Sequence, residues 1–104
     1  MKEIFTHMVF FWMKEPENQN HRDKFEASLS LFIDNSPQVV SRHIGHPAGT
    51  DRTVVDGTFT YSLVVTFYSK EDHDTYQADP AHHRFIDECQ DLWERVQVYD
   101  SIVL

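Results

Sequence analysis

Hydrophobic and polar residues alternate along several short stretches of the chain, and this alternation predicts β-strands. Residues 4–13 are rich in aromatic and branched side chains and are too few for a typical helix. Residues 60–68 alternate most clearly, whereas residues 38–46 and 96–104 give weaker strand patterns. Both faces of the first strand are largely apolar, so we expect both faces to be covered.

Two further stretches repeat apolar residues at helical spacing. The apolar positions are Phe25, Leu29, Phe32 and Ile33 within residues 21–34, and Phe85, Cys89, Leu92 and Trp93 within residues 80–94. Ser69, with an acidic residue three positions later, predicts a short helical turn before the second of these helices. A polar segment rich in turn formers, residues 47–58, is expected to form a loop.

The second helix begins with a strong start signal. Asp79 can accept hydrogen bonds from the free amides of the first turn, and Pro80 suits the first helical position. His82 lies three residues before Phe85 and so points along the apolar stripe, close to Tyr76. An inward-facing histidine is more often a hydrogen-bonded core residue than a catalytic one. His7 also interrupts an apolar strand face and needs a polar partner there.

The predicted order of elements is strand, helix, strand, strand, helix, strand. This order is typical of the ferredoxin-like α+β fold, βαββαβ with a four-stranded antiparallel sheet. With 104 residues, the chain is expected to be a single domain, residues 1–104. Two helices cover only one sheet face, so we expect a homodimer in which two sheets enclose a dimeric α+β barrel.

Composition narrows the possible partners. The formal charge is −8 and the basic residues are scattered, which argues against nucleic-acid binding. The apolar segment 4–13 is too short to span a bilayer, so no membrane association is predicted. Cys89 is the only cysteine, which excludes an intrachain disulfide, and its place on an apolar stripe favours a small buried hydrophobe over a nucleophile. We expect a cytoplasmic protein.

The histidines give little support for a metal site. His43 and His46 are three apart in an extended segment and would project from opposite faces, and the adjacent His82 and His83 diverge on a helix. The sequence leaves open a site made of His7, His82 and a carboxylate. We nevertheless predict no metal.

Other polar features are expected to be structural. His21 and His73 are interpreted as solvated residues near helix ends. The three glycines are scattered and form no phosphate-binding loop, so a nucleotide is not expected and we predict no cofactor.

Four groups of residues together resemble a known family. They are His7-Met8-Val9-Phe10-Phe11, Tyr61-Ser62-Leu63 before Phe67, Tyr76 with Pro80 and His82, and Val98-Tyr99-Asp100-Ser101. This set is similar to the stress-responsive α/β-barrel family, Dabb, over nearly the whole chain. The Tyr, Pro and His spacing, joined to a histidine in the first strand, is its most specific part. The resemblance implies a dimeric α+β barrel, in agreement with the predicted topology.

The resemblance also implies roles for three residues. Most members have no established reaction, but a plant polyketide cyclase of this family closes a ring by aldol chemistry with a His and a Tyr. By this resemblance His82 is the general base, Tyr76 orients or polarises the substrate carbonyl, and His7 supports the site. The cyclase has a further histidine before the proline, where this chain has Asp79, and that departure weakens the comparison with cyclase activity.

Three functions from different classes remain compatible with the sequence. The first is a cofactor-independent enzyme, acting on a small carbonyl or aromatic compound in the barrel cavity. The second is a module that binds a small apolar ligand, and the third is a structural stress-response dimer in which His7 and His82 form a mutually satisfied pair. The aromatic residues expected to line the cavity are Phe5, Phe11, Tyr61, Phe67 and Trp93.

Overall fold

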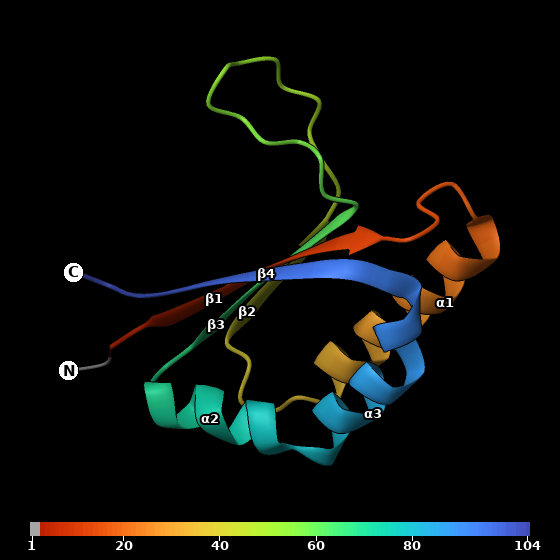
Figure 1. Ribbon diagram of the computed structural model, residues 1–104. Coiled ribbons are helices and arrows are strands. Elements are labelled where there is room, and N and C mark those ends of the chain that lie inside the picture. Colours follow the sequence, from red (N-terminus) through yellow and green to blue (C-terminus); the bar gives the residue numbers. More distant parts are fainter. Residues whose placement is uncertain (1–2) are drawn as a thin grey trace.

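All three α-helices lie on one face of a four-stranded antiparallel sheet, in a computed structural model that describes residues 3–104 (Figure 1). The strands are β1 (Phe5–Met13), β2 (Ser41–Gly45), β3 (Tyr61–Phe67) and β4 (Trp93–Ile102). The helices are α1 (Gln19–Asp34), α2 (Lys70–Ala78) and α3 (Pro80–Cys89). The strand order β2-β3-β1-β4 confirms the ferredoxin-like α+β fold predicted from the sequence.

Strand β1 is central, and its two faces have different surroundings. Its odd-numbered residues are buried beneath the helices and its even-numbered residues are half-buried on the opposite face. That outer face carries Met8, Phe10 and Trp12 from β1, and Phe10 contacts Tyr99 of β4 edge-to-face at 6.1 Å between ring centroids. Tyr99 is 57% exposed. Within the described residues, therefore, the helices cover one side of the sheet, and on the other side only loop residues such as Phe59, 5.0 Å from Phe10 between ring centroids, pack against it.

The predicted helix over residues 80–94 is too long at its C-terminal end. Helix α3 ends at Cys89, a single 3₁₀ turn (Gln90–Leu92) follows, and Trp93 already belongs to β4. The reason is tertiary: the amide of Lys14 donates to the carbonyl of Leu92 at 2.9 Å, and Trp93 is the register partner of Met13. Pairing with β1 overrides the helical spacing of the local sequence.

Two separate helices, α2 and α3, meet at a corner made by Asp79. The backbone amide of Asp79 donates to the carbonyl of Tyr76, and its carboxylate accepts from the amide of Ala81 at 2.8 Å. Asp79 therefore ends α2 and caps α3, with Pro80 at the first turn as predicted. At the other end of α2, the Ser69 hydroxyl accepts from the amide of Asp72, which confirms that predicted cap.

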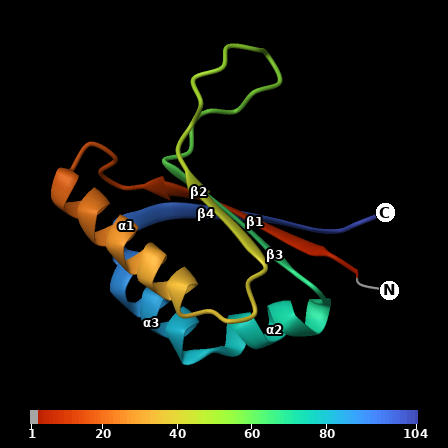
Figure 2. The same ribbon diagram turned by 180° about the vertical axis from the view of Figure 1, so that it is seen from behind.

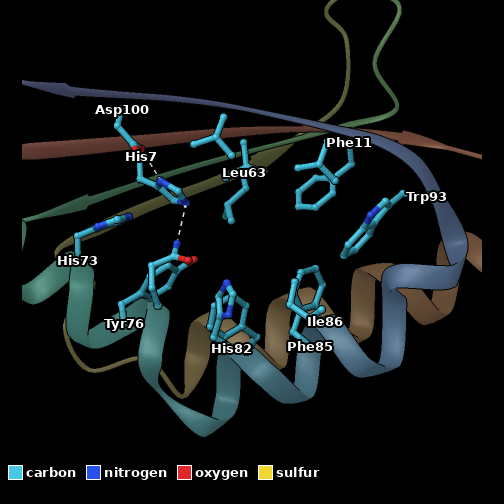
Figure 3. A pocket seen from close by; sticks show the side chains of 15 residues that line it. His7, Phe11, Leu63, His73, Tyr76, His82, Phe85, Ile86, Trp93 and Asp100 are labelled. Carbon is cyan, nitrogen blue, oxygen red and sulfur yellow. Dashed lines mark hydrogen bonds and ion pairs between the residues drawn. The ribbon is translucent and has the colours of Figure 1, made fainter.

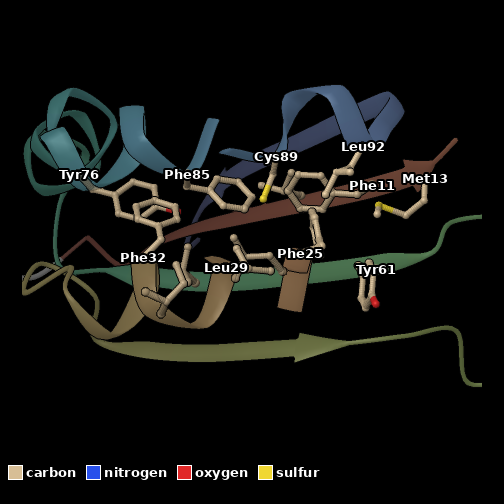
Figure 4. Close-up of a cluster of buried hydrophobic side chains, with 14 of the residues drawn as sticks. Phe11, Met13, Phe25, Leu29, Phe32, Tyr61, Tyr76, Phe85, Cys89 and Leu92 are labelled. Carbon is tan, nitrogen blue, oxygen red and sulfur yellow. The ribbon is translucent and has the colours of Figure 1, made fainter. Parts of the chain in front are cut away.

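The core is built largely from aromatic rings between the sheet and the helices (Figure 4). Phe25 of α1 stacks on Tyr61 at 4.6 Å between centroids, and Phe32 stacks on Phe85 of α3 at 5.4 Å. Cys89 is fully buried among these residues, and burial raises the pKa of its thiol. It is the small buried hydrophobe that the sequence predicted.

A long loop, residues 46–60, projects from one end of the sheet in both ribbon views (Figure 1, Figure 2). Near its base the Trp12 indole donates to the Thr58 hydroxyl at 2.9 Å. Strand β2 is shorter than the predicted 38–46, because a turn at residues 37–38 and a bend at residue 40 precede it. Within residues 3–104, none of the helices has the length and hydrophobicity needed to cross a bilayer.

Candidate functional site

A pocket of about 360 Å³ lies between the β1–β4 side of the sheet and helices α2 and α3 (Figure 3). Its lining comprises His7, Val9, Phe11, Phe32, Leu63, His73, Tyr76, Gln77, His82, Phe85, Ile86, Trp93, Val96, Val98 and Asp100. All three predicted site residues, His7, Tyr76 and His82, are therefore brought together. The pocket lies on the helix side of the sheet, within one protomer.

His7 has the polar partner that the sequence required, and that partner is Asp100. The two residues are direct register partners in the β1–β4 pair, and Nδ1 of His7 lies 2.5 Å from Oδ1 of Asp100. The carboxylate accepts the Nδ1 proton, which leaves Nε2 of His7 as the lone-pair nitrogen. The amide nitrogen of Gln77 lies 3.4 Å from that Nε2. Burial lowers the pKa of His7 and outweighs the opposing effect of Asp100.

His73 was expected to be solvated, and the structure shows the opposite. Its side chain is 12% exposed, and its ring stacks on Phe5 at 4.3 Å and lies 4.8 Å from the ring of His7. Nδ1 of His73 lies 3.2 Å from the carboxylate of Asp74, whereas Nε2 is buried without a hydrogen-bond partner among the described residues. The prediction failed because position 73 faces the sheet rather than solvent.

Tyr76 is 1% exposed and is held by its ring. The ring stacks on Phe32 at 5.0 Å and packs against Phe67 at 4.9 Å. Its hydroxyl has no hydrogen-bond partner within the described part of the chain. Burial raises the pKa of this phenol, so it keeps its proton and can donate a hydrogen bond at neutral pH.

His82 projects from the first turn of α3 toward the sheet (Figure 3). Its ring lies edge-to-face against Tyr76 at 5.9 Å and against Phe32 at 5.4 Å. Nδ1 is buried with no partner among residues 3–104. Burial lowers the pKa of His82, with smaller contributions in the same direction from His83, His7 and His73. No hydrogen bond joins His82 to His7 in the described chain, so the alternative in which the two form a mutually satisfied pair is not supported.

The pocket has a polar end and an apolar end. The imidazoles, the phenol and Asp100 lie toward one end, and Phe11, Ile86 and Trp93 lie toward the other (Figure 3). Of the five aromatic residues expected to line the cavity, Phe11 and Trp93 do so, whereas Phe5, Tyr61 and Phe67 are buried in the core. Such a division suits a ligand with an apolar body and one polar group.

Three residues at the polar end were missed from the sequence: His73, Gln77 and Asp100. A signal for Asp100 was present, because it alternates in phase with Val96 and Val98 and so belongs to the helix-facing side of the last strand. The sequence left open a metal site made of His7, His82 and a carboxylate, and the structure brings together a different set of residues. Ligand atoms of His7, His73 and Asp100, rather than of His82, lie within 4.8 Å of one another.

Comparisons with known proteins agree with this architecture. A family model described as the stress responsive A/B barrel domain matches residues 5–103. A search of the curated proteins found no match.

Several solved structures are similar over the whole fold. A hydroxynitrile lyase from Passiflora edulis has 26% sequence identity and a TM-score of 0.81, and the match covers 100% of this chain and 96% of that one. A Dabb family protein from Mesorhizobium loti has 14% identity and a TM-score of 0.81, covering 99% of both chains. A dimeric ferredoxin-like protein from Thermobifida fusca has 13% identity and a TM-score of 0.81, covering 99% of this chain and 93% of that one. The last two show the fold alone.

Proposed function

This chain belongs to the Dabb family of stress-responsive A/B barrel domains, and on that premise we propose that it binds a small carbonyl compound and moves a proton on it. The observation that supports this most strongly is the meeting of one phenol and two imidazoles around one pocket. Tyr76 lies 6.0 Å from His7 and 5.9 Å from His82 between ring centroids. Removal of a proton beside a carbonyl needs a base of near-neutral pKa and donors for the developing oxyanion.

The contacts of the two imidazoles favour different roles. Asp100 fixes the proton of His7 on Nδ1, so Nε2 can accept a proton from substrate once Gln77 moves aside. An unpartnered N–H is costly in a buried position, so His82 prefers to keep its Nδ1 unprotonated and to carry its proton on Nε2. We therefore assign the general base to His7. His82 and Tyr76 become the donors to the carbonyl oxygen.

This assignment differs from the one implied by the family resemblance, in which His82 is the base. The difference rests on one contact: Asp100 serves His7, and no described residue serves Nδ1 of His82. A carboxylate behind an imidazole holds the productive tautomer and stabilises the imidazolium that forms. Of His7 and His82, only His7 has that support among the described residues.

The apolar end limits the class of substrate. A pocket of about 360 Å³ lined by Phe11, Ile86 and Trp93 suits an aryl or alkyl chain attached to the carbonyl. The similar structure described as a hydroxynitrile lyase supports a lyase-type reaction. The same pocket would also serve the runner-up function, binding of a small apolar ligand without turnover.

We also propose that the protein is a homodimer. Similar solved proteins from Thermobifida fusca and Jannaschia are described as dimeric. On this chain, the sheet face opposite the helices carries Phe10, Trp12 and Tyr99, and no helix or second sheet among residues 3–104 covers it. A second sheet packed there would bury these side chains and form the α+β barrel.

The proposed reaction can be tested by proton exchange. The protein is incubated in D₂O with phenylacetone and a panel of other aryl and alkyl ketones, and deuterium at the carbon beside the carbonyl is followed by NMR. We expect incorporation faster than in buffer alone. The alcohol corresponding to phenylacetone is the control, because it has nearly the same size and shape but no acidic C–H beside a carbonyl. If the ketones of the panel bind but none of them incorporates deuterium, the function is ligand binding without turnover.

Substitutions at Asp100 and at His82 separate the roles of the two imidazoles, His7 and His82. Asp100→Asn should slow exchange on the order of 100-fold or more, because it removes the partner of the base. His82→Gln keeps an N–H donor and should retain more activity than His82→Phe. Equal loss in His82→Gln and His82→Phe, with Asp100→Asn near the wild-type rate, would return the general base to His82.

A further inference from the structure

His73 has the hydrogen-bonding arrangement of a metal ligand. Its Nδ1 lies 3.2 Å from the carboxylate of Asp74, so the proton of the neutral ring is held on that side. The free lone pair is then on Nε2, which is buried and has no partner among the described residues. A histidine that binds a metal usually donates its other ring N–H to a carboxylate or carbonyl in this way.

Two further ligands, one imidazole and one carboxylate, converge on the same place from different elements. His7 comes from β1, Asp100 from β4 and His73 from α2, and one ligand atom of each lies within 4.8 Å of the others. The rings of His7 and His73 are 4.8 Å apart between centroids, and Figure 3 shows both beside Asp100. The group is half enclosed, since His7 and His73 are largely buried while the Asp100 side chain is 38% exposed.

We infer that His7, His73 and Asp100 bind one first-row divalent transition-metal ion, with Zn²⁺ as the expected occupant. Two imidazole nitrogens and one carboxylate oxygen form a donor set that suits zinc, whereas Mg²⁺ and Ca²⁺ prefer oxygen ligands alone. With three protein ligands, a tetrahedral ion keeps its fourth position free for a water molecule or a ligand in the pocket.

Binding requires only local rearrangement. The 2.5 Å contact between Nδ1 of His7 and Oδ1 of Asp100 is replaced by bonds from both atoms to the ion, and the His7 proton moves from Nδ1 to Nε2. Gln77, which now presents its amide nitrogen to Nε2, can rotate its amide so that the carbonyl oxygen accepts that proton. No proton leaves the site and no residue changes its oxidation state.

Metal binding goes beyond the proposed reaction and does not depend on it. The ion would occupy the nitrogen of His7 that Asp100 now holds, so a protein loaded with Zn²⁺ is expected to lose the proposed base. Zinc would therefore be an inhibitor of proton exchange rather than a participant in it. Whether the ion binds can be measured with no ketone present, so the two proposals fail separately.

The test is titration of the full chain, freed of metal with a chelator, with Zn²⁺ followed by calorimetry and with Co²⁺ followed by visible absorption. The wild type should bind one ion per chain. His73→Phe preserves the ring stacked on Phe5 but removes Nε2, and Asp100→Asn removes a charged ligand at an exposed position. Each should weaken binding about tenfold or more. His83→Phe, at an exposed histidine on α3, is the matched control and should bind as the wild type does.

A second measurement uses the wild type alone and therefore tests metal binding even if His73→Phe fails to fold. Imidazole ¹⁵N shifts in the wild type should change on Zn²⁺ addition for His7 and His73 and stay constant for His82. Equal affinity in the wild type and Asp100→Asn, or shift changes confined to histidines outside the site, would overturn the inference.

Discussion

His7 and Asp100 are direct neighbours across the β1–β4 pair, and their side chains meet at 2.5 Å on the helix side of the sheet. The backbone register therefore fixes a carboxylate beside an imidazole without help from any loop. Groups supported by a sheet are held more accurately than groups on loops. This pair is therefore a polar element of the pocket that strand register holds in place.

We predict that His7 exists as the tautomer protonated on Nδ1. Long-range ¹H–¹⁵N correlation spectra should show distinct protonated and unprotonated ring nitrogens for His7 near neutral pH. In Asp100→Asn the acceptor loses its charge, and the two tautomers of His7 should become mixed. His83, which is exposed, provides the reference for a freely exchanging ring. A His7 already mixed in the wild type would contradict the prediction.

The two buried tyrosines should respond differently to loss of their hydroxyls. Tyr61 donates to Glu26 at 2.5 Å, so Tyr61→Phe should lower the free energy of unfolding by about 1 kcal/mol. The hydroxyl of Tyr76 has no protein partner in the described chain, so Tyr76→Phe should change stability by less than about 0.5 kcal/mol. Urea denaturation of the two variants checks this. A larger loss at Tyr76 would show that its hydroxyl is already bonded in solution.

The corner at Asp79 should matter for both stability and the site. Asp79→Ala removes the carboxylate that caps α3 and should cost about 1 kcal/mol of unfolding free energy. Ser69→Ala removes the cap of α2 at its other end and should cost a similar amount. Only Asp79→Ala should also weaken ketone binding, because Tyr76 and His82 flank that corner. Equal ketone binding by Asp79→Ala and Ser69→Ala would show that the cap of α3 does not position the ketone-binding residues.

The protein should become less stable as the pH falls through 6.5, the ordinary pKa of histidine. Burial lowers the pKa of His82 in the folded state, so the unfolded chain binds more protons in this range. The stabilisation is fully present above pH 6.5 and decreases as the pH falls toward the lowered value. Thermal unfolding between about pH 7.5 and pH 5 measures the slope. His82→Asn should have a shallower slope, and an unchanged slope would exclude His82 as a source.

Assembly should depend on the outer sheet face. Tyr99 is 57% exposed in the protomer, and Tyr99→Glu places a negative charge at that position. In a dimer, each of the two protomers would bring one such charge to the proposed interface. We expect this variant to sediment as a monomer where the wild type sediments as a dimer. Leu31→Glu, at a 47% exposed position on α1, is the control and should remain dimeric. A dimer that persists in Tyr99→Glu would place the interface elsewhere.

The fold was largely predictable because its signals are local. Alternation located β3, aromatic and branched composition located β1, and the cap at Asp79 with Pro80 located the start of α3. The end of that helix was not predictable in the same way. Residues 90–94 continue the helical spacing, but their structure is decided by the bond from Lys14 to Leu92 and by pairing of Trp93 with β1.

The site was predictable only where residues lie close in sequence. Tyr76 and His82 are six positions apart around one corner, so their proximity follows from local structure. Asp100 reaches His7 only through strand register, at a sequence separation of 93 residues. His73 was misassigned because a short polar helix gives no clear apolar stripe by which to tell its buried side from its exposed side.

The geometry at Asp79 has a consequence for how the chain can vary in length. Each residue added to a helix or deleted from it rotates the remaining turns by about 100°, so one insertion between Tyr76 and His82 would turn the imidazole away from the phenol. Insertions in the projecting segment 46–60 would leave the pocket lining unchanged, since none of its residues contributes to it. Engineered lengthening should therefore be tolerated at that segment and abolish ligand binding at the corner.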